Sequence, residues 1–151
     1  MRGVKRPLLG LAVLALAGCG GGGAGGGPSE DPGAAMTHII RLELLGQRDL
    51  SYQLLVREQR QVVDKRLYRT CSPGPTMPGA KIEVRGVKDE TAVVPVLGRT
   101  KTKAVSWRLT VQEAGSPVTV SNVGHLIAQD GRWHWTLSAQ SLKLLRAGLC
   151  P

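Results

Sequence analysis

The sequence contains no phenylalanine and few aromatic residues of any kind. Three tryptophans and two tyrosines make up its 3% aromatic content. No run of lysine and arginine is interleaved with aromatic residues, so we expect no nucleic-acid partner. The three histidines show no Ser/His/Asp spacing that would suggest a hydrolase triad. The N-terminal apolar run, residues 8–17, is too short to span a bilayer as a helix, which takes about 20 residues.

Glycine is abundant, but the main glycine tract has no phosphate-loop signature. It follows no strand and contains no Lys-Ser/Thr pair. Residues 19–35 also include Pro28 and Pro32 and little that could pack, so we expect a flexible tether there. A glycine-rich chain of this length reaches roughly 20 Å. The remaining residues, 36–151, are enough for one small globular domain.

The chain begins with the three parts of an export signal. Arg2, Lys5 and Arg6 give a positive start, the apolar run follows, and small residues precede Cys19. The motif Leu16-Ala17-Gly18-Cys19 resembles the lipobox of bacterial lipoproteins. This resemblance implies a signal peptide over residues 1–18, a lipid on the Cys19 thiol, and a membrane-anchored protein that faces the extracytoplasmic side. The alternatives are a cleaved soluble secretory protein and a buried structural Cys19.

The charge balance is strongly positive. The formal net charge is +9, and without the three basic residues of the leader 17 basic side chains remain against 11 acidic ones, or +6. Outside the cytoplasm, the available polyanions are lipid headgroups and wall polymers. Association with a wall or membrane through charge is therefore a further class of function, and it predicts binding that weakens with salt.

Helical spacing of apolar residues predicts three helices at the start of the domain. The first covers residues 36–46, Asp49 caps a short second helix with Leu50 and Tyr52, and the third covers residues 59–71. The proline- and glycine-rich residues 72–79 end the helical part. Ser138 is expected to cap a final helix whose apolar stripe is Leu142, Leu145 and Leu149.

From residue 80 the apolar period changes to two, which predicts strands. We expect a turn at Lys88-Asp89-Glu90, a basic hairpin tip over residues 98–103, and a two-residue turn at Asp130-Gly131. That turn would pair Ala128 with Trp133 and Leu126 with Trp135. The result is an α+β fold with a curved antiparallel sheet of about four to five strands. The expected strands cover residues 81–85, 91–97, 105–111, 118–129 and 132–137.

Several short motifs resemble the NTF2-like (SnoaL-like) superfamily. They are Gln47-Arg48-Asp49-Leu50, a third helix ending in Cys71, and Asp130-Gly131-Arg132-Trp133 after a curved sheet. The closing segments 133–137 and 147–151 resemble bacterial lipoproteins of that shape whose function is unassigned. The resemblance implies a cone-shaped cavity between the helices and the sheet. Because the family contains isomerases, dehydratases and hydrolases beside members with no chemistry, the fold alone does not give the function.

The expected register places no acid and no histidine toward this cavity. Asn122 is the only polar side chain among the inward strand positions, and Tyr52 and Tyr68 could reach the cavity from the helices or belong to the core. We therefore expect no catalytic residue and no cofactor, with an NTF2-like enzyme as the alternative. The inward strand residues are Val105, Trp107, Leu109, Val111, Val118, Val120, Asn122, Gly124, Leu126, Ala128, Trp133, Trp135 and Leu137.

His125 and His134 fall on the opposite face, diagonally across the last hairpin. Two imidazoles could bind a metal, but a site needs a third and usually a fourth ligand, and Arg132 would repel a cation. We expect surface or dimer-contact histidines and no metal.

The remaining two thiols, Cys71 and Cys150, lie in a chain that the leader directs to an oxidising compartment. The sequence predicts a disulfide between them, and two reduced, buried thiols are the alternative.

The expected partners follow from the anchor and the cavity. They are membrane lipid through Cys19, a small apolar ligand or a partner protein at a cavity lined by Tyr52, Tyr68, Trp107, Asn122 and Trp135, and a second copy through the outer sheet face. The basic residues Arg99, Lys101 and Lys103 could touch anionic headgroups or form a solvated tip.

Overall fold

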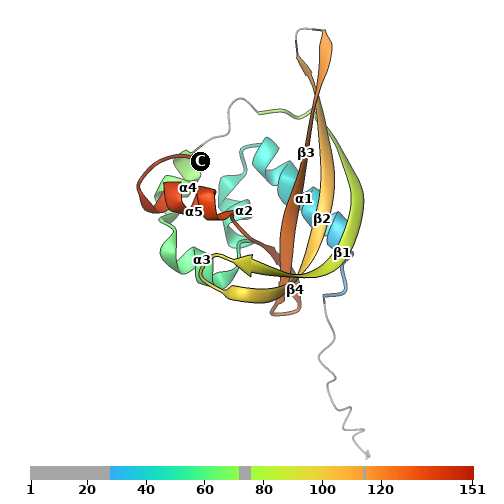
Figure 1. The fold of residues 1–151 in the computed structure, drawn as a ribbon. Helices are drawn as coiled ribbons and strands as arrows, with labels where there is room; N and C mark the ends of the chain where they lie inside the picture. The colour runs from blue at the N-terminus through green and yellow to red at the C-terminus, as the bar shows by residue number, and fades with distance from the viewer. Residues whose placement is uncertain (1–27, 72–75, 114) are drawn as a thin grey trace, which may run out of the picture.

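The computed structural model describes residues 28–71, 76–113 and 115–151 (Figure 1). The leader, Cys19 and the first part of the tether lie outside this range. The fold is α+β, with one open antiparallel sheet in the order β1-β2-β3-β4. The elements are α1 (Pro32–Leu44), α2 (Arg48–Gln53), α3 (Arg57–Val62), α4 (Lys65–Thr70), β1 (Lys81–Val94), β2 (Gly98–Glu113), β3 (Ser116–Gln129), β4 (Arg132–Trp135) and α5 (Ala139–Arg146).

Helix α1 begins four residues before the predicted position. Pro32 occupies the first turn, where its missing N–H costs nothing, and the Asp31 carboxylate accepts a hydrogen bond from Ala34 N at 2.9 Å. The indole of Trp133 donates to Glu30 O at 2.7 Å, which joins this segment to β4. Residues 30–35 are therefore part of the folded domain and not of the predicted tether.

The predicted third helix is two short helices. Val63 has an extended backbone and is buried, and Asp64 caps α4 by accepting from Leu67 N at 2.7 Å. The expected cap of the second helix is also wrong, because α2 starts at Arg48 and Asp49 lies inside its first turn. There Asp49 pairs with Arg69 of α4 at 2.9 Å.

Strand β1 is continuous through the predicted turn at Lys88-Asp89-Glu90. Asp89 stands opposite Lys103 of β2 and pairs with its Nζ at 2.7 Å, so the charges stabilise the ladder instead of breaking it. A β-bulge between Val84 and Gly86 bends the strand. The true turn follows Val94, so residues 98–103 are the start of β2 and not a basic tip.

The last hairpin has the predicted register. Asp130 and Gly131 both have positive φ, at 51° and 72°, as a two-residue type I′ turn requires. Ala128 pairs with Trp133, and Leu126 pairs with Trp135. Leu126 and Trp135 belong to a core cluster with Met36, Ile39 and Ile40 of α1, which lies across the concave face of the sheet (Figure 1).

Two residues predicted on the outer face are buried. Ile127 and His134 are each 8% exposed, because the end of the β1–β2 hairpin and the segment between α2 and α3 cover this part of the sheet. Val56 and Val94 pack against Ile127 there. Backbone hydrogen bonds from Val56 N to Trp135 O, at 3.0 Å, and from Trp135 N to Leu54 O, at 2.9 Å, fix the covering segment beside β4.

Four residues predicted to face the cavity are exposed: Val118, Val120, Asn122 and Ala128. Val118 and Val120 are 41% and 51% exposed, because the tip of the β2–β3 hairpin projects beyond the body of the domain (Figure 1). Ala128 is also exposed, close to the tight turn of the last hairpin. The helices therefore cover a shorter part of the concave sheet face than the apolar alternation along the strands predicts.

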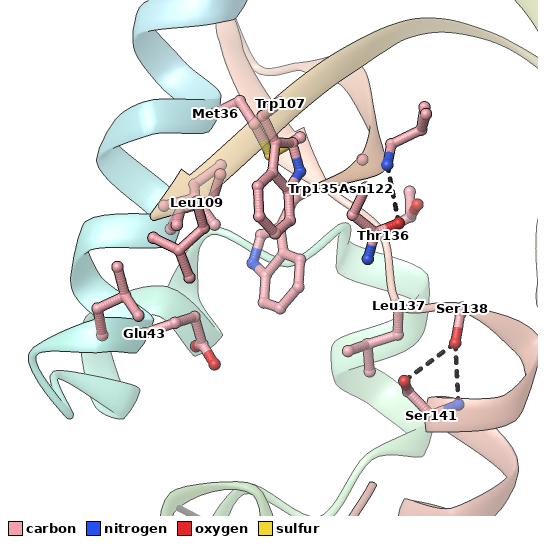
Figure 2. Close-up of a pocket in the computed structure, with 15 residues that line it drawn as sticks. Met36, Glu43, Trp107, Leu109, Asn122, Trp135, Thr136, Leu137, Ser138 and Ser141 are labelled. Carbon is pink, nitrogen blue, oxygen red and sulfur yellow. Dashed lines mark hydrogen bonds between the residues drawn. The ribbon is translucent and has the colours of Figure 1, made fainter. Parts of the chain in front are cut away.

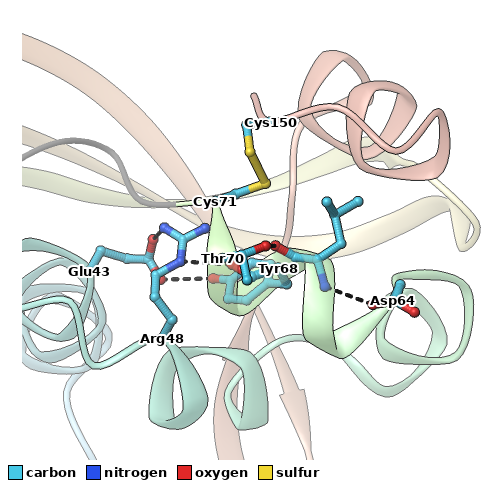
Figure 3. Close-up of a disulfide and its surroundings, with 8 residues drawn as sticks. Glu43, Arg48, Asp64, Tyr68, Thr70, Cys71 and Cys150 are labelled. Atoms are coloured by element: carbon cyan, nitrogen blue, oxygen red, sulfur yellow. Dashed lines mark hydrogen bonds and ion pairs between the residues drawn. A yellow bond between two sulfur atoms is a disulfide. The ribbon is translucent and has the colours of Figure 1, made fainter.

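The predicted disulfide between Cys71 and Cys150 is present (Figure 3). It joins the residue after α4 to the segment after α5, across 79 positions of sequence. Around it lies a second core cluster, which includes Leu55, Val63, Leu142 and Leu145. The bond therefore connects the C-terminal helix to the group of short helices.

Candidate functional site

A pocket of about 370 Å³ lies between α1, the middle of β2 and β3, and the segment from β4 into α5 (Figure 2). Its wall is mainly apolar. Met36 and Ile39 come from α1, and Trp107, Leu109 and Trp135 come from the sheet. The polar lining side chains are Glu43, Asn122, Thr136, Ser138 and Ser141.

The five residues predicted to line a cavity divide into two groups. Trp107, Asn122 and Trp135 line the pocket. The Trp135 indole is fixed by donating to Ser51 O at 2.9 Å. Tyr52 and Tyr68 instead belong to the neighbouring core around the disulfide.

Gly124 lies in the pocket wall directly against the end of the Met36 side chain. A Cβ at Gly124 would lie 2.4 Å from Met36 Cε and 2.9 Å from Met36 Sδ. Contacts this short are not tolerated, so a larger residue would push the Met36 side chain out of its position. Gly124 thus leaves room for the end of the Met36 side chain against β3 at one side of the pocket.

Glu43 is the ionisable residue that the sequence analysis missed. It lies in the last part of α1, seven positions after Met36, and this spacing places both on one helix face. Strand alternation carries no information about this residue, whereas its helical spacing from Met36 does. Its side chain is 21% exposed and points into the pocket (Figure 2).

Glu43 is held by two partners from the neighbouring helices (Figure 3). The Tyr68 hydroxyl donates to Oε1 at 2.7 Å, and Arg48 Nη1 pairs with Oε2. Arg48 is itself fixed, because its Nε donates to Tyr68 O at 3.1 Å and its guanidinium lies 4.3 Å from the centre of the Tyr68 ring. The carboxylate therefore has a set position in the pocket wall.

Tyr68 acts only as a neutral donor in this arrangement. It is 1% exposed, and burial raises the pKa of its phenol far above the ordinary value, with the Glu43 charge adding in the same direction. Ser51 Oγ lies 3.2 Å from the same hydroxyl. The phenol proton thus stays in place to bond Glu43.

The two histidines on the last hairpin contact different groups. His125 Nε2 lies 2.6 Å from Glu90 Oε1, and His134 Nδ1 donates to Leu55 O at 3.2 Å. Over the described ranges 28–71, 76–113 and 115–151, no three His, Cys, Asp or Glu side chains gather where they could hold a metal. A more polar hollow beside α3 is lined by Arg60, Arg132 and His134.

The chemistry of the pocket wall is that of a binding site with one charged group. Among the described residues, Glu43 is the only acid that lines it, and no histidine does. No helix in the described part of the chain has the length and apolar character needed to cross a membrane. Comparisons of the chain with protein-family models, with curated proteins and with solved structures found no match.

Proposed function

We propose that this protein is a lipid-anchored lipoprotein on the extracytoplasmic side of the cell membrane, and that its domain, NTF2-like in shape, binds a small apolar ligand. The observation that carries the binding function is the pocket of about 370 Å³ with two indoles in its wall. This volume falls in the range of small-molecule sites, which are mostly apolar with a few placed polar groups.

The anchor is supported by the leader and by the disulfide. The positive start, the apolar run and Leu16-Ala17-Gly18-Cys19 together match what lipid modification of Cys19 requires. A disulfide between Cys71 and Cys150 fits a compartment where thiols oxidise.

Quenching of tryptophan fluorescence by bromo-octanol tests the pocket. The full chain with Cys19→Ser suits this experiment, because without a lipid it needs no detergent. Trp107 and Trp135 line the pocket, so a bound bromine quenches them, and the quenching should saturate. A linear, non-saturating response would show that the pocket does not bind the probe.

Two matched substitutions on one strand place the binding site. Leu109 lines the pocket, whereas Val111 has the same orientation on β2 but lies beyond the pocket wall. Leu109→Phe should weaken bromo-octanol binding by about tenfold, and Val111→Phe should leave it unchanged. Phenylalanine adds no tryptophan signal. Equal effects of both substitutions would contradict binding in this pocket.

A second candidate function, enzymatic proton abstraction, is favoured by Glu43 alone. A carboxylate in an apolar pocket is a chemically reasonable general base. Against it, both carboxylate oxygens already accept hydrogen bonds, and no second acid or histidine lines the pocket among the described residues.

Nitrobenzisoxazole separates the two functions. A base removes the ring C–H proton, the electrons of the C–H bond form a nitrile, and the N–O bond breaks. The oxygen keeps the electron pair of the N–O bond, which gives a coloured cyano-nitrophenolate. If the protein only binds ligands, the wild type opens this ring no faster than Glu43→Gln. Turnover that depends on Glu43 would instead support the enzyme.

A further inference from the structure

Glu43 presents a negative charge to the pocket without exposing the matching positive charge. Glu43 is part of the pocket wall, whereas its partner Arg48 is not and has a side chain only 10% exposed. Among the described lining residues, no lysine, arginine or histidine opposes the carboxylate across the pocket. A bound molecule therefore meets the acceptor side of this ion pair (Figures 2 and 3).

The carboxylate also has hydrogen-bonding capacity left over. An ionised carboxylate offers about four acceptor positions. Tyr68 uses one on Oε1 and Arg48 uses one on Oε2. About two acceptor positions are therefore left for a donor from a ligand or from water, on a side chain that is 21% exposed.

A ligand that fills the pocket displaces the solvent that would donate hydrogen bonds to Glu43. If it brings only hydrocarbon to Glu43, the remaining acceptor positions are buried without donors, which lowers affinity by about tenfold or more. If it brings a second carboxylate, repulsion in a poorly solvated site adds to the loss. A hydroxyl or an ammonium group at this point avoids both costs, and the ammonium also gains attraction.

We propose that the ligand is an amphiphile whose apolar body lies against Met36, Trp107 and Trp135 and whose head, an amine or a hydroxyl, donates a hydrogen bond to Glu43. This inference rests on the proposed ligand-binding function and specifies the ligand class. It excludes fatty-acid carboxylates as the preferred ligand of the pocket.

Three probes with the same chain test the head-group preference in the Cys19→Ser protein. Octylamine, octanol and octanoate each compete with bromo-octanol for the pocket, and recovery of tryptophan fluorescence measures their affinities. Octylamine should bind at least about tenfold more tightly than octanoate, with octanol between them. Octanoate binding as tightly as octylamine would overturn the inference.

Glu43→Gln identifies the group responsible. The amide keeps an acceptor oxygen but removes the charge, so the preference for octylamine over octanoate should disappear while octanol affinity changes little. Glu83→Gln, on β1, is the matched control: it removes the same charge from a residue outside the pocket wall and should keep the preference. A preference that survives Glu43→Gln would overturn the inference.

The outcomes separate this inference from the function it rests on. If bromo-octanol does not bind, ligand binding itself fails. If all three probes bind equally, the pocket binds ligands but Glu43 does not select among them. If Glu43→Gln does not fold, the wild-type ranking of the three probes decides alone.

Discussion

A single buried amide, that of Gln59, connects three parts of the fold. Gln59 is 0% exposed, its Oε1 accepts from Leu137 N at 2.7 Å, and its Nε2 donates to Leu137 O and Pro95 O at 3.2 and 3.3 Å. Gln59→Leu removes these bonds and leaves buried backbone groups without partners. We expect a loss of roughly 2–4 kcal/mol in the free energy of unfolding, measured by urea denaturation.

Gln61 is the matched control for this substitution. It lies on the same helix but is exposed, so Gln61→Leu should change the free energy of unfolding by less than about 0.5 kcal/mol. Similar midpoints for both variants would show that the Gln59 bridge contributes little to stability.

Tyr68 should titrate only when the protein unfolds, and Tyr52 should titrate at a higher pH than a free tyrosine. Burial is the largest cause that raises the pKa of both Tyr52 and Tyr68 above the ordinary value. Above about pH 10 the unfolded chain loses phenol protons that the folded chain keeps, so stability falls as pH rises. Because the chain has only these two tyrosines, tyrosinate absorbance reports them alone.

Absorbance and circular dichroism followed together measure this titration. Tyrosinate formation at Tyr68 should coincide with the loss of folded structure at alkaline pH. Tyr68→Phe should be less stable at neutral pH, because Glu43 loses a donor, and its stability should fall less steeply above about pH 10. Tyrosinate absorbance that reaches its full amplitude while the fold persists would contradict the prediction.

The sequence predicts the place of a single residue where the local pattern fixes the face of the strand or helix on which its side chain lies. Trp107 and Trp135 follow from strand alternation, and the Asp130-Gly131 turn fixes the register that places Trp135. The position of Glu43 on the same face as Met36 follows equally from helical spacing. Gln59 could not be found, because nothing local distinguishes it from the exposed Gln61 two positions later.

At the scale of elements, two predictions were wrong: the turn at residues 88–90 and the exposure of the outer sheet face. Contacts with residues distant in sequence explain both. Lys88-Asp89-Glu90 has the composition of a turn, but β2 places Lys103 opposite Asp89 and makes a strand favourable. The outer face at Ile127 is buried by Val56 and Val94, which are distant in sequence. Strand period shows which residues share a face, but not which face another segment will cover.

The disulfide is an element-scale constraint that can be removed chemically. A link across 79 positions lowers the entropy of the unfolded chain, worth up to about 4–5 kcal/mol in the chain-entropy model. Reducing agent should therefore lower the urea midpoint of the Cys19→Ser protein markedly. The reduced chain should lose first the packing of α5 on α4, because the bond lies between their ends.

The Cys71→Ser/Cys150→Ser variant, also with Cys19→Ser, is the control for the reductant. It has no cysteine left, so its midpoint should be low already and should not respond to reducing agent. If the oxidised and the reduced Cys19→Ser protein had the same urea midpoint, the disulfide would contribute nothing to stability.

At the scale of the whole molecule, the α+β class and the single antiparallel sheet were predictable from the change of apolar period near residue 80. The pocket itself was not. Its volume depends on how far the sheet curls and on close approaches such as Met36 on Gly124, which tertiary packing sets. An apolar pattern predicts a core, and only the packed structure shows where the core leaves a space.

The proposed location of the molecule rests on lipid modification of Cys19. If the thiol carries a diacylglyceryl group, two acyl chains give stable anchoring, whereas one alone binds only marginally. The wild type should therefore fractionate with membranes and show the lipid mass at its N-terminal cysteine. Cys19→Ser should move to the soluble fraction with its disulfide intact, and Cys71→Ser/Cys150→Ser should stay with membranes. A Cys19→Ser chain that remains in the membrane fraction, or a wild type with an unmodified Cys19 thiol, would show that something other than this lipid sets its location.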